Sequence, residues 1–289
     1  MTLLMAFTMV CLLPPSAVRA ASLRFAAGQK GEFHFDTGVL KGVLRAEGKS
    51  KGFTSVVHAP SGMRVDRNTM GLLSPYRVFK TNYRYASAAW DWPSQANLED
   101  DGSVSVLWPV EKDRPFELKA RYVLVDSETL SVEFQVKAVE ILPAFEVFLA
   151  SYFDTPFTNA MVLAKGSEGG AAHWISATQA QGDWQMFPRE DAVIPMIQDG
   201  RWKQEPNPVD WFQLQKFSEP KAMRRAGSDG LAAILSADTK DCFAVSMPFQ
   251  TEGHYSLYFS LFGKTINAGE TAVAKARMQI TSRPEASGR

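Results

Sequence analysis

The chain has 289 residues, of which 45% are hydrophobic and 21% are charged, and its formal net charge is zero. This composition is ordinary for a globular protein, and the length suits one large β domain or two smaller ones. No long block of basic residues occurs, so the sequence argues against nucleic acid and against an anionic membrane surface as partners.

The first 20 residues have the pattern of an export signal. An apolar run over residues 3–13 is followed by small residues near Val18 and Ala20, which fit a signal-peptidase site. The run is too short to span a bilayer as a stable anchor, so we expect no integral membrane segment once residues 1–20 are removed. These features predict a periplasmic or extracellular protein.

Cys242 is the only cysteine after residue 20. A single cysteine forms no internal disulfide and no cysteine-based metal site, and we expect neither a metal nor another cofactor. Its neighbours Phe243, Ala244 and Val245 are apolar, so the pattern predicts a buried free thiol.

Short strands are expected to begin the mature chain. The segments LRFAA, EFHFD, VLKGVLRA and FTSVV have strand composition and are separated by glycine-containing turns. Residues 72–92 are less regular, and they interleave polar groups with aromatic rings. The residues of interest there are Arg77, Asn82, Arg84, Trp90, Asp91 and Trp92. Fixed donors beside ring faces are typical of a site for a small polar ligand, and the alternative is a loop that packs its rings over a sheet edge.

Residues 102–138 predict sequential antiparallel strands. Apolar and polar residues alternate over residues 104–108, 116–124 and 130–138, with turn residues between the runs. In the last run one face carries Leu130, Val132, Phe134, Val136 and Ala138. That face is expected to lie in the core, and the opposite face at the surface.

A further strand is expected from Phe145 to Asp154, after an interruption at Pro143. One of its faces is largely apolar. The opposite face carries Glu146, Phe148, Ala150, Tyr152 and Asp154. Two carboxylates and two aromatic rings on one face suit a ligand groove, and the alternative is a partly solvated sheet face.

Residues 155–210 are irregular and contain His173 and Trp184 among glycines, prolines and acids. Segments of this kind are usually functional or mobile, so we expect loops that cover one mouth of the sheet. Residues 220–230 favour a short helical turn. Strands are expected to resume at residues 231–235, 242–247, 255–261 and 272–280, and the tail, residues 283–289, is expected to be disordered. The whole pattern predicts a single all-β domain over residues 21–282.

Three stretches resemble the galactose mutarotase-like, or aldose 1-epimerase-like, family. Residues 102–138 are similar to its central strand pair, and Leu149 to Asp154 are similar to its Asn-His-Ser/Thr-Tyr-Phe-Asn segment. Ile266 to Thr271 are similar to the turn with Gly-Glu that precedes its final strand. The resemblance implies a large antiparallel β-supersandwich with a sugar groove on its concave sheet face.

The sequence departs from the family at its catalytic positions. Ala150 stands where the resemblance places the histidine that acts as general acid on the sugar ring oxygen. Residues 242–248 correspond to the segment that carries the glutamate base, and they contain no acid. The family's His-Gly-Phe-x-Arg segment has no histidine counterpart between Arg77 and Trp92. Epimerisation needs both an acid and a base, so we expect a diverged member without epimerase activity.

These observations predict an exported carbohydrate-binding protein, and no catalytic residue is assigned. The candidate substrate-binding residues are Arg77, Asn82, Arg84, Trp90, Asp91, Trp92, Glu146, Tyr152, Asp154, His173 and Trp184. The first alternative is a carbohydrate-active enzyme with a relocated site. Hydrolysis needs two carboxylates, for example Asp91 with Glu146, and elimination needs a base such as Tyr83, Tyr152 or His173. The second alternative is a non-catalytic scaffold or interaction module.

Overall fold

A computed structural model describes residues 23–67, 70–167, 170–228, 230–249, 253 and 255–283. The predicted export signal, residues 1–20, lies outside the described residues, as do residues 284–289 of the predicted tail. The described chain forms three sheets with very little helix, and the predicted all-β antiparallel fold is confirmed. In the described part of the chain, no helix is long and apolar enough to cross a bilayer.

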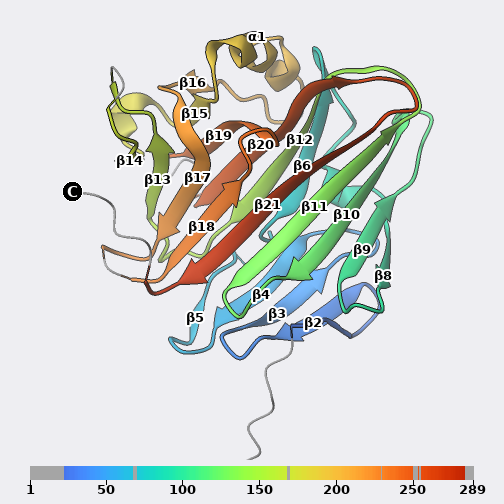
Figure 1. Cartoon of the computed structure of the whole chain (residues 1–289), viewed down its shortest axis with the longest axis vertical. Helices are drawn as coiled ribbons and strands as arrows, with labels where there is room; N and C mark the ends of the chain where they lie inside the picture. Colours follow the sequence, from blue (N-terminus) through green and yellow to red (C-terminus); the bar gives the residue numbers. More distant parts are fainter. Residues whose placement is uncertain are drawn as a thin grey trace, which may run out of the picture.

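A nine-stranded sheet crosses the front of the view in Figure 1. Its strands lie in the order β14 (His173–Ser176), β13 (Asn159–Ala164), β17 (Phe217–Arg225), β18 (Ala232–Ala237), β21 (Thr271–Thr281), β11 (Thr129–Ala138), β10 (Phe116–Leu124), β9 (Val104–Trp108) and β8 (Gln95–Leu98). The predicted inward face of β11 is buried along its whole length. On the outward face, Lys275 of β21 lies 2.6 Å from the Glu133 carboxylate of β11.

A seven-stranded sheet packs behind the first. Its strands lie in the order β16 (Phe212–Gln213), β15 (Trp184–Pro188), β19 (Cys242–Pro248), β20 (Ser256–Ile266), β12 (Leu142–Tyr152), β6 (Ser74–Lys80) and β7 (Tyr83–Arg84). One continuous apolar core lies between the two sheets, and it contains Val132 of β11, Leu149 of β12 and Phe259 of β20. Cys242 is a free thiol buried in this core, as predicted.

A five-stranded sheet formed by the first part of the chain lies at the lower edge of Figure 1, in blue. Its strands, in order, are β1 (Ala26–Ala27), β2 (Glu32–Asp36), β3 (Leu40–Arg45), β4 (Gly52–His58) and β5 (Met63–Arg64). Phe53 of β4 packs edge-on against Tyr122 of β10, with ring centroids 5.5 Å apart. This contact joins the third sheet to the core of the sandwich.

Residues 189–211 connect β15 to β16 and cover the outer face of the seven-stranded sheet. They contain the short helices η4 (Asp191–Val193), α1 (Ile194–Ile197) and η5 (Arg201–Lys203), and α1 is visible at the top of Figure 1. Val193, Ile197 and Trp202 from this cover pack on the sheet in a second apolar cluster. As a result β12 is buried on both faces, toward the sandwich core and toward the cover.

Two expectations about local structure need correction. Residues 155–210 contain the strands β13, β14 and β15 as well as loops. The helical turn predicted within residues 220–230 is wrong, because that stretch begins inside β17, which pairs with β13 and β18. Pro220 is accommodated because it lies just before the first residue paired with β18, at an irregular point of the pairing with β13. The described part of the chain also contains the short helices η1 (Ala89–Asp91) and η3 (Gln179–Gln181).

Candidate functional site

A cleft of about 490 Å³ lies between the outer face of the seven-stranded sheet and the cover formed by residues 189–211. Its lining residues are Met70, Tyr76, Arg77, Trp90, Phe148, Tyr152, Trp184, Trp202, Asn207, Pro208, Val209, Trp211 and Tyr258. Eight of these thirteen residues are aromatic, and Arg77 is the only one of them with a charged side chain. The volume, and a lining in which aromatic rings surround a few polar groups, are typical of a small-molecule site.

The floor of the cleft comes from the strands β12 and β20. Strand alternation sends Phe148 and Tyr152 outward from the core, on the predicted face of β12. Tyr258 of β20 is hydrogen-bonded to Tyr152 at 3.4 Å between hydroxyl oxygens, and it accepts a hydrogen bond of 2.9 Å from Ser256 Oγ. Burial raises the pKa of Tyr258 to about 12 and that of Tyr152 well above its ordinary value. Both phenols are therefore neutral near pH 7.

Tryptophans form the walls. Trp202 and Trp211 belong to the cover, and their rings meet edge to face with centroids 5.2 Å apart. Trp211 meets Trp184 of β15 in the same way at 5.7 Å. On the opposite side Trp90 of η1 stacks on Tyr76 at 4.4 Å, with an interplanar angle of 15°. These contacts hold one ring against another, which fixes the shape of the aromatic cleft.

Arg77 of β6 supplies the only charge of the lining, and its side chain is just 3% exposed. One guanidinium nitrogen, Nη2, donates to the Asn207 carbonyl oxygen at 2.8 Å and to the Tyr76 hydroxyl at 3.2 Å. The guanidinium also lies over the rings of Tyr76 and Trp202. Within the described structure, neither Nε nor Nη1 has a hydrogen-bond partner.

Arg84 lies near Arg77 but does not line the cleft. It donates to the backbone carbonyl oxygens of Glu205 and Pro206, the latter at 2.8 Å. Burial and the positive charge of Arg77 both lower the pKa of Arg84. Arg84 therefore holds the loop that carries Asn207, and it brings a second positive charge close to the first.

Glu146 does not face the cleft with a free carboxylate. Its Oε2 atom accepts a 2.8 Å hydrogen bond from Nη1 of Arg201, and both side chains are almost fully buried. Arg201 also binds Asp199 at 2.9 Å and the Ala144 carbonyl oxygen at 3.1 Å. Burial lowers the pKa of Arg201, but the charges of Glu146 and Asp199 raise it by more. Glu146 thus anchors the cover to β12.

The other predicted site residues outside the cleft have structural contacts or surface positions. Asn82 donates its backbone N–H to Asp199. Asp91 lies 3.6 Å from Lys49 and 3.5 Å from Lys51. Trp92 is buried in the sandwich core, Asp154 Oδ1 accepts a hydrogen bond from the Thr155 amide, and His173 is exposed on β14. Of the predicted residues, the structure gathers Arg77, Trp90, Tyr152 and Trp184 in the cleft.

Several lining residues were not among the candidates from the sequence: Tyr76, Phe148, Trp202, Asn207, Trp211 and Tyr258. Phe148 was already on the predicted groove face. Tyr258 lies on the face of β20 opposite Leu257 and Phe259, so alternation also carried a signal for it. Trp202 and Trp211 lie in irregular chain, where no periodicity relates them to a sheet face.

The two positions at which the resemblance would place an acid and a base lie on neighbouring strands, on either side of β20. Ala150 on β12 and Ser246 on β19 both pair with Tyr258 of β20, which lies between them. Ala150 and Ser246 are fully buried, and Ser246 Oγ has no partner among the described residues. Among the described residues lining the cleft, none is Asp, Glu or His, and the described chain brings no three such side chains or cysteines together as a metal site.

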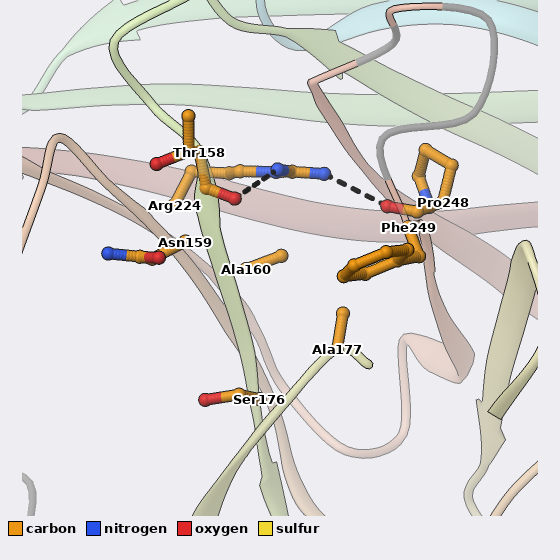
Figure 2. A pocket seen from close by; sticks show the side chains of 8 residues that line it. All are labelled: Thr158, Asn159, Ala160, Ser176, Ala177, Arg224, Pro248 and Phe249. Carbon is orange, nitrogen blue, oxygen red and sulfur yellow. Dashed lines mark hydrogen bonds between the residues drawn. The ribbon is translucent and has the colours of Figure 1, made fainter. Parts of the chain in front are cut away.

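A smaller cavity of about 70 Å³ lies beside Arg224 on β17 (Figure 2). Nη1 of Arg224 donates to the Thr158 carbonyl oxygen and Nη2 to the Pro248 carbonyl oxygen, both at 3.1 Å. Burial lowers the pKa of Arg224 to about 10. Further bonds to the carbonyl oxygens of Phe157 and Ser256 occupy the guanidinium, which ties the ends of several strands together. This cavity is small and its cation is already coordinated, so the aromatic cleft is the better candidate.

The sequence matches no protein-family model and no curated protein. Solved structures with similar folds include a proposed aldose 1-epimerase from Escherichia coli K12, with a TM-score of 0.50 and 13% identity over 86% of this chain and 98% of that one. A mutant of the heparan sulfate lyase HepC from Pedobacter heparinus gives a TM-score of 0.52 at 8% identity, covering 93% of this chain and 38% of the lyase.

A TPR-domain-containing protein from Parabacteroides distasonis ATCC 8503 gives a TM-score of 0.50 at 11% identity, covering 89% of this chain and 48% of that one. The chain thus spans less than half the length of this protein and of the lyase. At these identities the similarity shows a shared fold. The predicted resemblance to the mutarotase-like supersandwich is confirmed at that level.

Proposed function

We propose that the chain is a carbohydrate-binding protein and that its sugar site is the aromatic cleft. The observation that carries this proposal is the composition of the lining, in which eight aromatic side chains surround a few fixed polar groups. The C–H faces of a sugar ring stack on aromatic rings, and its hydroxyls need donors and acceptors held in place. Arg77, Tyr152, Tyr258 and the Asn207 backbone offer such groups.

The names of two structural neighbours support this class of ligand. The Escherichia coli protein is described as a proposed aldose 1-epimerase, and the Pedobacter heparinus protein as a heparan sulfate lyase. Both names refer to carbohydrates, although both similarities are similarities of fold. The export signal expected in residues 1–20 would place this chain in the periplasm or outside the cell, where it would meet glycans.

We further propose that the site binds without epimerising its ligand. The methyl group of Ala150 carries no proton, and Ser246 offers no carboxylate where the resemblance would place a base. The tyrosines of the floor have raised pKa values, which makes them poor general bases near pH 7. Of the bases considered for elimination, Tyr152 lines the cleft, whereas Tyr83 and His173 do not. For hydrolysis, neither Asp91 nor Glu146 lines it.

The proposal is tested by screening the purified protein on a glycan array and titrating the best binder by calorimetry. Trp184→Ala removes a wall of the cleft, and Trp174→Ala is the matched control, because Trp174 is also partly exposed but lies on β14. We expect Trp184→Ala to weaken binding on the order of 3- to 10-fold, as for the loss of one aromatic contact, and Trp174→Ala to leave it unchanged.

Two outcomes would contradict the proposal. Failure of the unmodified protein to bind any glycan would favour the scaffold alternative. Release of reducing ends, or of unsaturated products that absorb in the ultraviolet, would show a hydrolase or a lyase in place of a binding protein.

A further inference from the structure

Arg77 is a buried cation for which the described structure provides no counter-charge. A guanidinium has five N–H donors, and the three on Nε and Nη1 of Arg77 have no partner among the described residues. No ion pair of Arg77 with a described carboxylate occurs. Burial of an unpaired charge is costly, and such groups usually have a functional explanation.

Other deeply buried arginines in this protein are satisfied. Arg201 is bound by the carboxylates of Glu146 and Asp199, and Arg224 is bound by backbone carbonyl oxygens. The fold can therefore pair a buried guanidinium when its role is structural. Arg77 differs in that it lines the aromatic cleft, where a bound ligand would supply the missing partner.

The surroundings of Arg77 add to its positive potential. Arg84 lies close enough for the charge of Arg77 to lower its pKa, and its guanidinium donates to neutral carbonyl oxygens. No carboxylate is among the described residues lining the cleft. In a site with little water, charges of one sign act strongly on a ligand of the opposite sign.

We infer that the cleft selects sugars that carry an anionic group, a uronate carboxylate or a sulfate, and that Arg77 binds this group. The inference rests on the proposed carbohydrate site and names its ligand class. The Asn207 carbonyl oxygen accepts from Nη2 at 2.8 Å, as one oxygen of an anionic group would. A small outward movement of Asn207, which itself lines the cleft, would open the guanidinium to a carboxylate or sulfate in two-point contact.

The test compares matched oligosaccharides on the whole protein. The probes are neutral cello-, galacto- and xylo-oligosaccharides, their uronate counterparts, including oligogalacturonate and oligoglucuronate, and O-sulfated forms of the neutral series. We expect an acidic member to bind on the order of 10- to 100-fold more tightly than its neutral counterpart, and to weaken as the salt concentration rises. The uronate and sulfated series show which anion is preferred.

Two variants separate ligand recognition from loop support. Arg77→Gln is expected to abolish the preference for the acidic sugar, so that the acidic and the neutral members of each pair bind with equal affinity. Arg84→Gln is the matched control, because Arg84 also holds carbonyl oxygens of residues 205–206 without lining the cleft. Because the charge of Arg84 adds to the potential at Arg77 without lining the cleft, we expect Arg84→Gln to reduce the acidic preference less than Arg77→Gln does and not to abolish it.

The outcomes distinguish the two proposals. Equal binding of neutral and acidic sugars, or an acidic preference that survives Arg77→Gln, overturns the inference and leaves the carbohydrate site intact. An equal loss of the acidic preference in Arg77→Gln and in Arg84→Gln also overturns the inference, because support of the loop at residues 205–207 would then explain both losses. Failure to bind any of the probes, neutral or acidic, counts against the carbohydrate site itself.

Discussion

Nη1 of Arg201 lies 2.8 Å from Oε2 of Glu146, and this ion pair joins the cover of the cleft to the strand that forms its floor. Gly200, with φ of +98°, precedes Arg201, and a Cβ atom at this position would clash with the Asn82 side chain. The turn at residues 199–201 is held both by β12, through Glu146, and by the turn between β6 and β7, where the Asn82 amide donates to Asp199. The carboxylate that the sequence suggested as a ligand group is instead part of the support of the site.

Breaking this pair is expected to destabilise the fold. Arg201→Met leaves the Glu146 carboxylate buried without its cation, and we expect a loss of about 3–5 kcal/mol in the free energy of unfolding. The double variant Arg201→Met with Glu146→Leu removes both charges and is expected to lose less than Arg201→Met alone. Urea titration followed by tryptophan fluorescence measures both. A loss below about 1 kcal/mol in the single variant would show that the pair is not a buried anchor.

The attachment of the cover is expected to weaken in acid through Asp199. Partial burial raises the pKa of Asp199, but hydrogen bonds from the Arg201 side chain and from the Asn82 and Arg201 amides lower it by more. A carboxylate with a lowered folded-state pKa adds stability above its unfolded pKa, about 3.9, and that stability is lost as the pH falls through the folded value.

The stability difference between the unmodified protein and Asp199→Asn should therefore shrink as the pH falls from 6 toward 3, measured by urea midpoints. Asp238→Asn is the control, because Asp238 is exposed in the turn between β18 and β19, outside the cover. A difference that stays constant over this range would show that the Asp199 charge does not hold the cover.

Cys242 is expected to be unreactive in the native state. It is fully buried in the sandwich core, and burial raises the pKa of its thiol. In Cys11→Ser protein, we expect no labelling by a thiol reagent under native conditions and complete labelling in urea. Labelling of the folded protein at the rate of an exposed thiol would contradict the burial of this side chain.

Restoring the family's acid and base at the related positions is not expected to create a mutarotase in one step. Ala150→His places a ring where a fully buried methyl group now lies beside Tyr258, and such overpacking costs about 1–3 kcal/mol. We expect neither the unmodified protein nor Ala150→His to accelerate the mutarotation of fresh α-hexoses, as measured by polarimetry.

The double variant Ala150→His with Ser246→Glu is the informative comparison. Tyr258 pairs with both positions from the strand between them, so the two new side chains would flank it. Activity in the double variant alone would show that the pocket still accepts the family's chemistry. Substantial mutarotation by the unmodified protein would mean that other residues carry the proton transfers.

The sequence predicted the sandwich because its strands alternate with period two. The inward residues of β11 and β21 are buried as expected, and the outward face of β12 does line a cleft. The cover escaped prediction because its contacts are specific rather than periodic. The pairing of Arg201 with Glu146 joins residues 55 positions apart, and the local sequence around neither residue indicates it. Residues 220–225 were misjudged because local helix formers are overridden by pairing on both sides of β17.

The two faces of β12 are constrained by different requirements, one by folding and the other by the cleft. Val147 and Leu149 belong to the sandwich core, whereas Phe148 and Tyr152 face the cleft. Changes at the second set can alter which ligand the cleft accepts, while the first set keeps the two sheets together. Along this strand, residues under selection for folding should therefore alternate with residues under selection for ligand recognition.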